Sequence, residues 1–428
     1  MSFRWRKETL FFVAAAILAL PPLLAVALFF SPEREPEIFF AAYWERPIPL
    51  QGPPPASFTE REASLRPEAC GSCHERQYAD WKSSLHSRAT GPGPRGQLID
   101  MIQKSPEEAN LCMTCHGPLG EQMAFIARTG AGGERIYEKN PQLDPQLQLE
   151  GITCAACHVR GHRRFGPPRA GGGGTPDYPP GPGNHGGVQR TAHFEKAEFC
   201  KGCHQFDPGS STLVNGKPLQ DTYREWRRSE WGKAGAACQD CHMPNRRHLW
   251  RGIHDPEWVK DAVLIEARLR PSSSPARNAV ELEVEVTNAA VGHNFPTYIT
   301  PKVFLRAELL DEAEKTLPGT LQEAVIGWDA RFEGGSWKEY FDTRVPPGGK
   351  HKQAFRWTSP GQAKKIRARV EVHPDHFYHV HFYPSYLQGR DLSPEGRRLI
   401  EKARRESGLT AYPLFDRVIP LGGSVPQS

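Results

Sequence analysis

One five-residue pattern, Cys-x-x-Cys-His, constrains this chain more than any other feature of its sequence. It occurs at residues 70–74, 112–116, 154–158, 200–204 and 238–242, which we call motifs 1 to 5, and it uses all ten cysteines. A random chain of this length and composition would contain about 0.01 copies. The repeats therefore indicate one cofactor chemistry that is used five times.

Three chemistries use paired cysteines at this spacing. A tetrahedral zinc site needs two Cys-x-x-Cys halves per ion and gives no reason for a histidine after every pair. A thioredoxin-like dithiol is a single motif in a βαβ setting. A c-type haem needs two thiols for thioether bonds and an adjacent imidazole for the iron, so the pattern predicts five covalently bound haem c groups.

Each motif then predicts its own cofactor-binding residues. The expected thioether positions are Cys70, Cys73, Cys112, Cys115, Cys154, Cys157, Cys200, Cys203, Cys238 and Cys241. The expected proximal iron ligands are His74, His116, His158, His204 and His242.

The sixth position on each iron decides between an electron carrier and a catalyst. Two imidazoles close the iron, whereas an open position permits catalysis. Histidines outside the motifs but within the same region are His86, His162, His185, His193, His248 and His254. Because His162 follows His158 by four residues, on the same face of any helix there, we expect it to serve a neighbouring haem rather than its own.

The N-terminus suggests a membrane segment. Residues 10–30 are uncharged and follow Arg4, Arg6 and Lys7. A helix of this length would be roughly 30 Å long, enough to cross the hydrocarbon layer. A cleaved signal peptide is the competing interpretation. We expect an uncleaved single anchor in the bacterial inner membrane, with the rest of the chain in the periplasm or outside.

The formal charge of +5 does not indicate a nucleic-acid partner. Each haem has two propionates, so five haems would add roughly ten negative charges and make the loaded protein mildly acidic. The charge of the bare chain therefore predicts no nucleic-acid binding.

The expected fold class is an α-rich, loop-heavy multihaem cytochrome c domain followed by an all-β immunoglobulin-like sandwich, with one N-terminal transmembrane helix. The expected boundaries are an anchor at 1–32, a Pro-rich linker at 33–66, a pentahaem domain at 67–258, a β-sandwich at 259–386, and a C-terminal helix and tail at 387–428. Residues 280–286 and 366–372 alternate apolar and charged side chains, which is typical of half-buried strands. Ser393 as N-cap, Pro394 at the first position and Gly408 as the stop predict the C-terminal helix.

Several segments resemble a known family of multihaem c-type cytochromes, which includes the tetrahaem electron acceptor of hydroxylamine oxidoreductase and the octahaem tetrathionate reductases. Residues 70–89, with Trp81, Ser84 and His86 in a Trp-x-x-Ser-x-His pattern, are similar to the first-haem segment of that family. Residues 222–244 and 248–256 resemble later segments, and residues 291–297 are like a segment of attached β-domains. The haem number differs from the four or eight of those relatives, so no single member's function transfers.

The resemblance also implies distal ligands. The histidine of the Trp-x-x-Ser-x-His pattern corresponds to His86, and the segment after motif 5 offers His248 or His254. His293 would reach a haem from the β-domain. The predicted distal set is His86, His162, His193, His254 and His293.

A second group of histidines lies late in the chain, at His373, His376, His379 and His381. Only the nearby Asp375 could complete a metal site, so we interpret this stretch as an aromatic-rich strand or an edge that faces a haem.

The expected function is electron transfer through a chain of mostly bis-histidine haems. Expected partners are redox proteins, namely a membrane quinol-oxidising or other respiratory complex and a soluble or outer-surface cytochrome. The alternative is an oxidoreductase acting on nitrite, hydroxylamine or tetrathionate at one open haem. No motif has lysine in place of the histidine, but Arg246, Arg247 and Arg251 could line an anion pocket near the last haem.

Overall fold

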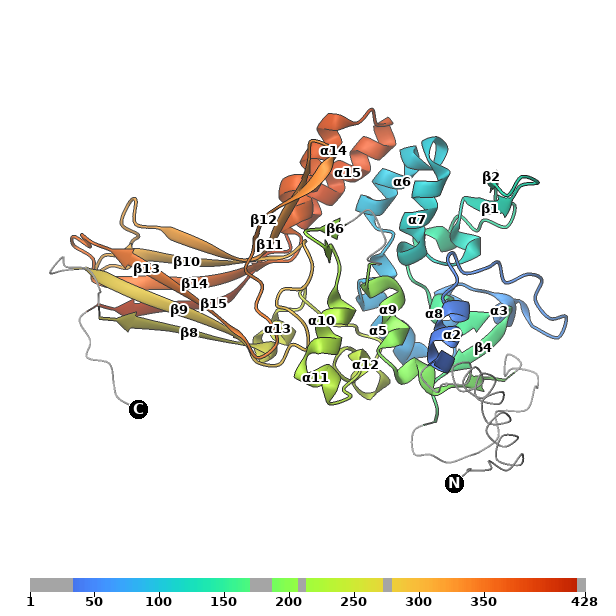
Figure 1. Cartoon of the computed structure of the whole chain (residues 1–428), viewed down its shortest axis with the longest axis horizontal. Helices are drawn as coiled ribbons and strands as arrows, with labels where there is room; N and C mark the ends of the chain where they lie inside the picture. Colours follow the sequence, from blue (N-terminus) through green and yellow to red (C-terminus); the bar gives the residue numbers. More distant parts are fainter. Residues whose placement is uncertain (1–33, 170–186, 207–212, 272–278, 422–428) are drawn as a thin grey trace, which may run out of the picture.

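The computed structural model describes residues 34–169, 187–206, 213–271 and 279–421. The five motifs lie among short helices at one end of the molecule, and two β-sheets extend from the other end (Figure 1). The two parts are joined by α13 (Pro256–Ala262), after which the first long strand begins.

Short helices make up the motif-bearing part. Its α-helices are α2 (Arg34–Tyr43), α3 (Glu60–Ala63), α4 (Pro67–Gly71), α5 (Glu75–Ser83), α6 (Pro92–Lys104), α7 (Pro106–His116), α8 (Cys154–His158), α9 (Glu198–His204), α10 (Thr222–Arg228), α11 (Glu230–Lys233) and α12 (Cys238–His242). Its 3₁₀ turns are η1 (His86–Arg88), η2 (Gly120–Gln122), η3 (Leu147–Leu149), η4 (Ala192–Glu195) and η5 (Pro244–Arg246). Its largest buried apolar group contains only Ile48, Leu119, Leu147, Ala155, Ala156 and Val159.

Small strands connect these helices. They form three sheets, made of β1 (Phe125–Thr129) with β2 (Arg135–Lys139), β3 (Val159–Arg160) with β4 (Arg163–Gly166) and β5 (Gln189–Arg190), and β6 (Leu213–Val214) with β7 (Lys217–Pro218). None of these strands is long enough to organise a core, so local hydrogen bonding and the motifs must position this region.

The second part is a sandwich of two sheets. The strand order is β12-β11-β10-β14-β15 in one sheet and β13-β9-β8 in the other, and neighbouring strands are antiparallel. The strands are β8 (Val263–Arg270), β9 (Val280–Asn288), β10 (Lys302–Leu310), β11 (Gln322–Glu333), β12 (Ser336–Asp342), β13 (Lys350–Trp357), β14 (Lys365–His373) and β15 (Tyr412–Pro420).

The alternating segments of the sequence form strands as predicted. Residues 280–286 lie in β9, where Leu282, Val284 and Val286 are at most 1% exposed. Residues 366–372 lie in β14 and pack against the same core. A period of two places one set of side chains between the sheets and leaves the charged set in water. Both strand predictions are therefore confirmed.

After β14 the chain returns to the motif-bearing part and forms helices that pack there. A π-helix (Tyr378–Phe382) leads into α14 (Tyr383–Gly389) and α15 (Pro394–Ser407). The predicted cap is confirmed, because the Ser393 side chain accepts a hydrogen bond from the Gly396 amide. α15 packs so closely on α6 that a Cβ atom on Gly96 would lie 2.9 Å from the Ile400 side chain. The chain then goes back to the sandwich as β15.

The predicted fold class is wrong in its transmembrane helix. Among the described residues, no helix is long and apolar enough to cross a membrane, and the expected span at residues 10–30 lies outside them. We therefore withdraw the transmembrane helix and the inner-membrane localisation that depended on it. One sheet of the sandwich also contains β15, which follows α15 in the segment that was expected to form only a helix and a tail.

Candidate functional site

Each motif lies at the end of a short helix. The motif histidine is the last residue of α7, α8, α9 and α12, whereas His74 follows α4 and is the N-cap of α5. In a helix, positions i, i+3 and i+4 share one face. The two thiols and the imidazole of a motif therefore point to the same side, which is the arrangement that one covalently attached porphyrin requires.

Cysteines of different motifs lie close to one another. The thiols of Cys70 and Cys154, of Cys115 and Cys203, and of Cys200 and Cys238 are near enough to shift each other's pKa. Motif 1 therefore lies against motif 3, motif 2 against motif 4, and motif 4 against motif 5. The negative charge of Cys157 in motif 3 would also raise the pKa of both motif 4 thiols, which places these two motifs close together.

Backbone carbonyls orient three of the motif histidines, whereas Nδ1 of His204 lies 3.3 Å from the side-chain nitrogen of Gln220. In those three, Nδ1–H donates to a carbonyl oxygen, and these bonds join His116 to Ala89 at 2.6 Å, His158 to Phe165 at 2.8 Å, and His242 to Arg251 at 2.6 Å. Such a bond fixes the tautomer and leaves Nε2 without a proton. The donor set therefore fits a haem iron at Nε2.

Within the part of the chain that the structure describes, a second imidazole faces three motif histidines, His158, His204 and His242. The ring centroids of His242 and His293 are 6.3 Å apart with an interplanar angle of 6°, those of His158 and His248 are 6.2 Å apart, and those of His86 and His204 are 6.3 Å apart. Two imidazoles that bind one metal from opposite sides have centroids about 6 Å apart, because each metal–nitrogen bond is about 2 Å long. All three separations fit an intervening iron.

Burial keeps these rings neutral. It lowers the pKa of His86 to about 3, and it lowers the pKa of His158 and His204 to about 4. Burial also lowers the pKa of His248 and His293, whose Nδ1 atoms donate to the carbonyls of Arg246 and Asn294. Only a neutral imidazole can bind a metal, so the protonation state suits the proposed ligand role.

Three histidines of the predicted distal set make other contacts. His162 donates from Nε2 to the Gly52 carbonyl at 2.9 Å. Nε2 of His254 lies 3.0 Å from Oδ2 of Asp375. The His193 ring stacks on Phe39 with centroids 4.0 Å apart. Among the described residues, neither His162 nor His254 lies opposite a motif histidine.

His248 is the ligand candidate that the predicted set omitted. Its backbone amide donates to Asp80 at 3.0 Å, and the side chain of the adjacent Arg247 donates twice to the same carboxylate, at 2.5 and 2.6 Å. Asp80 is on α5, next to motif 1, and is 4% exposed. The family resemblance allowed either His248 or His254 as the ligand. The contact of His248 with Asp80, which is distant in the sequence, favours His248.

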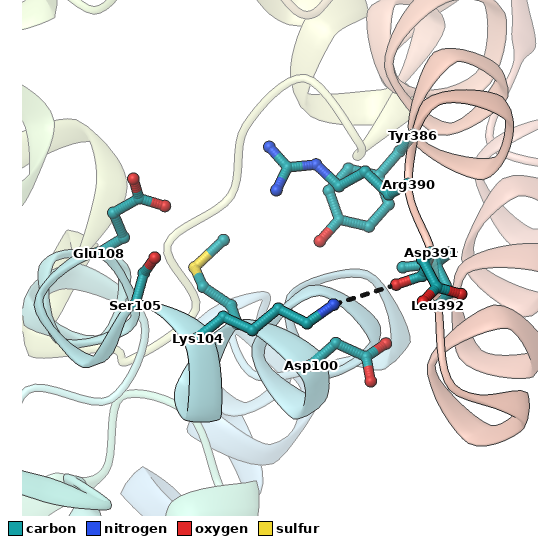
Figure 2. Close-up of a pocket in the computed structure, with 9 residues that line it drawn as sticks. Asp100, Lys104, Ser105, Glu108, Tyr386, Arg390, Asp391 and Leu392 are labelled. Atoms are coloured by element: carbon teal, nitrogen blue, oxygen red, sulfur yellow. Dashed lines mark hydrogen bonds between the residues drawn. The ribbon is translucent and has the colours of Figure 1, made fainter.

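Motif 2 differs from motifs 3, 4 and 5. Within the described residues, no second imidazole ring faces His116. The first half of the same helix, α7, borders a cavity of about 200 Å³, which lies between α6, α7 and the loop after α14 (Figure 2). The cavity is lined by Asp100, Met101, Lys104, Ser105, Glu108, Tyr386, Arg390, Asp391 and Leu392. Acidic and basic side chains are mixed, so its charge selects no single class of ligand.

The late histidines do not form a metal centre. No group of three or more histidine, cysteine, aspartate or glutamate side chains in the described part of the chain is placed to hold a metal ion. His373 and His376 instead pack on Phe304, with centroids 4.6 and 5.3 Å from its ring. The aromatic packing agrees with the sequence interpretation, but the predicted strand is wrong: only His373 lies in a strand, at the end of β14, whereas His379 and His381 lie in the π-helix Tyr378–Phe382.

Comparisons with known proteins agree with the motifs. Residues 69–159 match the family model described as cytochrome c554 and c-prime. A solved pentahaem cytochrome c552 from Thermochromatium tepidum has a TM-score of 0.54 at 18% identity, with 83% of this chain and 99% of that chain covered. Together they support a multihaem c-type cytochrome with covalently bound haem.

Other matches add nothing to this conclusion. A structural-genomics target of 8% identity, covered over 73% of its length against 26% of this chain, has a TM-score of 0.15. An ApaA protein from Bordetella pertussis, at 12% identity with 94% of its chain and 38% of this chain covered, has a TM-score of 0.17. No curated protein matches this sequence.

Proposed function

We propose that this chain is a pentahaem cytochrome that transfers electrons between redox proteins. Haem bound at each motif supplies reversible one-electron chemistry. The main support is the set of three imidazole pairs whose centroids lie 6.2–6.3 Å apart. Such pairs close the iron on both sides, as an electron carrier requires.

The proposed axial pairs cross between motifs and domains. His86, which follows motif 1 in the sequence, serves motif 4. His248, which follows motif 5, serves motif 3. His293, from the loop between β9 and β10, serves motif 5. Each pair ties together segments that are distant in the sequence, so ligation would also hold the fold together.

The close approach of motif cysteines gives the proposed path. It supports the order 1, 3, 4, 5, with motif 2 beside motif 4. Cys73 and Cys241 are exposed, whereas the other eight cysteines are partly buried. We therefore assign electron entry and exit to the two ends of this path, at motifs 1 and 5, where redox partners can approach.

Haem counting and low-temperature EPR test the proposal together. Pyridine haemochrome analysis should give five haems per chain. The oxidised protein should show low-spin signals from motifs 3, 4 and 5 that added nitrite does not change. Fewer haems, or high-spin signals from several sites, would contradict the proposal.

A second candidate is an oxidoreductase that acts on nitrite or hydroxylamine at motif 2. The observation in its favour is that no imidazole from the described residues faces His116. Under this alternative, one high-spin signal should disappear or shift when nitrite is added. Substitution of His116 by alanine should then abolish that response and leave the low-spin signals in place.

A further inference from the structure

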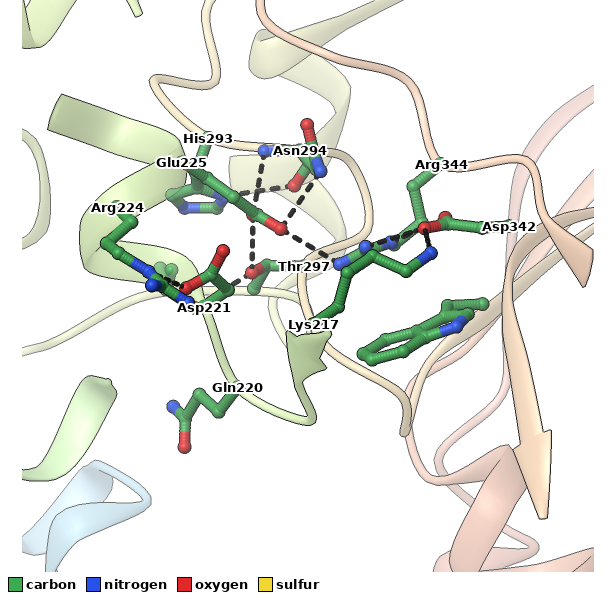
Figure 3. Close-up of polar contacts among 12 residues, drawn as sticks. Lys217, Gln220, Asp221, Arg224, Glu225, His293, Asn294, Thr297, Asp342 and Arg344 are labelled. Atoms are coloured by element: carbon green, nitrogen blue, oxygen red, sulfur yellow. Dashed lines mark hydrogen bonds and ion pairs between the residues drawn. The ribbon is translucent and has the colours of Figure 1, made fainter. Parts of the chain in front are cut away.

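The loop that bears His293 is held by the motif-bearing part of the chain. Residues 289–301 connect β9 to β10, and the carboxylate of Glu225 on α10 receives four hydrogen bonds at this junction (Figure 3). The donors are the Asn294 amide at 3.2 Å, Asn294 Nδ2 at 2.9 Å, Thr297 Oγ1 at 3.1 Å and Arg344 Nη1 at 2.9 Å. Two of these donors belong to the residue that follows His293.

The pair of Glu225 and Arg344 is almost completely buried. Their side chains are 8% and 5% exposed. A buried carboxylate is costly unless it is fully paired, and burial raises the pKa of Glu225 against the opposing charge of Arg344. Arg344 is held in turn by both oxygens of Asp342 at 2.8 Å, and Lys217 bonds the same carboxylate at 2.8 Å. This network of charged side chains therefore fixes the position of the Glu225 carboxylate.

The loop is also fastened to the sandwich. Asn288 at the end of β9 donates from Nδ2 to the His293 carbonyl at 2.9 Å and to the Val345 carbonyl at 3.0 Å. The backbone of His293 is thus fixed from the sandwich side by Asn288, and the next residue is fixed from the α10 side by Glu225. Between these two points the imidazole lies parallel to that of His242, with an interplanar angle of 6°.

We infer that Glu225 is a positioning residue, which holds the His293 imidazole in line with the iron site of motif 5. Arg344 is its counter-ion and makes the buried carboxylate tolerable. This inference rests on the proposed axial role of His293. It adds to that role a carboxylate on α10, Glu225, which aligns the His293 ligand from the sandwich.

The test compares four variants of the full-length, haem-loaded protein by EPR. His293→Ala defines the signal of motif 5 without its second imidazole, and we expect one high-spin haem per chain that returns to low spin with added imidazole. Glu225→Ala should produce the same high-spin signal. Glu225→Gln should produce a smaller fraction, because it keeps an acceptor oxygen but loses the charge that faces Arg344. The double variant of His293→Ala and Glu225→Ala should show no more high-spin haem than His293→Ala alone.

Glu308→Gln is the matched control. Glu308 on β10 is also 8% exposed and bonds an arginine, Arg369, at 3.0 Å, but it does not contact the His293 loop. It should lower thermal stability without a change of spin state.

Two results would overturn the inference. If His293→Ala gives a high-spin haem while both Glu225 variants stay low-spin like Glu308→Gln, Glu225 is only structural. If His293→Ala itself stays low-spin, the proposed axial assignment fails, and the inference fails with it. Should Glu225→Ala not fold, Glu225→Gln and Thr297→Val decide the question, since each removes one part of the contact and should give a partial high-spin signal.

Discussion

Replacement of Asp80 by asparagine should weaken the link between motif 1 and the segment that bears His248. In the wild type, Oδ1 accepts from Arg247 Nη2 at 2.5 Å, and Oδ2 accepts from Arg247 Nε at 2.6 Å and from the His248 amide at 3.0 Å. Asparagine keeps one acceptor oxygen and turns an NH₂ group toward these donors. At least one charge-assisted hydrogen bond is therefore lost, and the remaining donors face a neutral acceptor instead of a charged one.

The magnitude follows from burial. Each hydrogen bond to a charged group contributes about 1.5–3 kcal/mol when its partners are buried. The Arg247 side chain is 36% exposed, so water replaces part of what it loses, whereas Asp80 is nearly inaccessible. We expect Asp80→Asn to lower the free energy of unfolding by about 2 kcal/mol at neutral pH.

The loss should depend on pH. The side-chain hydrogen bonds from Arg247, helped by the His248 amide, hold the pKa of Asp80 below its usual value. A carboxylate with a lowered folded pKa stabilises the protein fully above its unfolded pKa of about 3.9, and this contribution falls as the pH drops toward the folded pKa. The difference between wild type and variant should therefore shrink below about pH 4.

Urea unfolding followed through the Soret band measures this difference, and Asp416→Asn is the control. Asp416 also bonds an arginine, Arg367, but the two side chains are 37% and 40% exposed. A pair so accessible to water should contribute less than about 1 kcal/mol. Equal losses for the two variants, or a loss at Asp80 that does not change with pH, would refute the argument from burial.

Three further outcomes are expected. His86→Ala should give one high-spin haem by EPR, because His204 loses the imidazole that faces it. Trp328→Ala should lower the free energy of unfolding by about 3–5 kcal/mol in the same urea assay, since the ring is fully buried and Nε1 donates to Glu339 at 2.7 Å. Burial lowers the pKa of Lys302 to about 8, so the unfolded chain binds a proton that the folded chain lacks between that pH and 10.5. As the pH increases through this range, the free energy of unfolding of the wild type should therefore rise by up to about 3 kcal/mol relative to that of Lys302→Met.

Sequence patterns predicted the structural elements that depend only on residues close together in the sequence. The alternation in β9 and β14 and the cap of α15 depend on neighbouring residues, and both could be read from the sequence. The motifs identified the thioether and proximal positions as predictions in the same way. For each of these features, a short stretch of chain contains all the information.

The proposed partners of the three paired motif histidines depend on tertiary contacts. His86 belongs by sequence to motif 1, but its ring faces His204 of motif 4. The choice of His248 over His254 depends on Asp80, which is far away in the sequence. The strand β15 was also missed, because residues 412–420 follow a helix and do not alternate regularly between buried and exposed. Only its pairing with β14 makes it a strand.

Because β15 follows α15 at the end of the chain, it is the last strand that can join the sandwich. Domains form as the chain emerges from its N-terminal end. The five motifs are synthesised before residue 243, but the edge of β14 stays unpaired until residues 412–420 are available. The loop with His293 is part of that unfinished sandwich. Motif 5 should therefore be the last of the three paired sites to mature, and truncation before β15 should trap the protein with that one site incomplete.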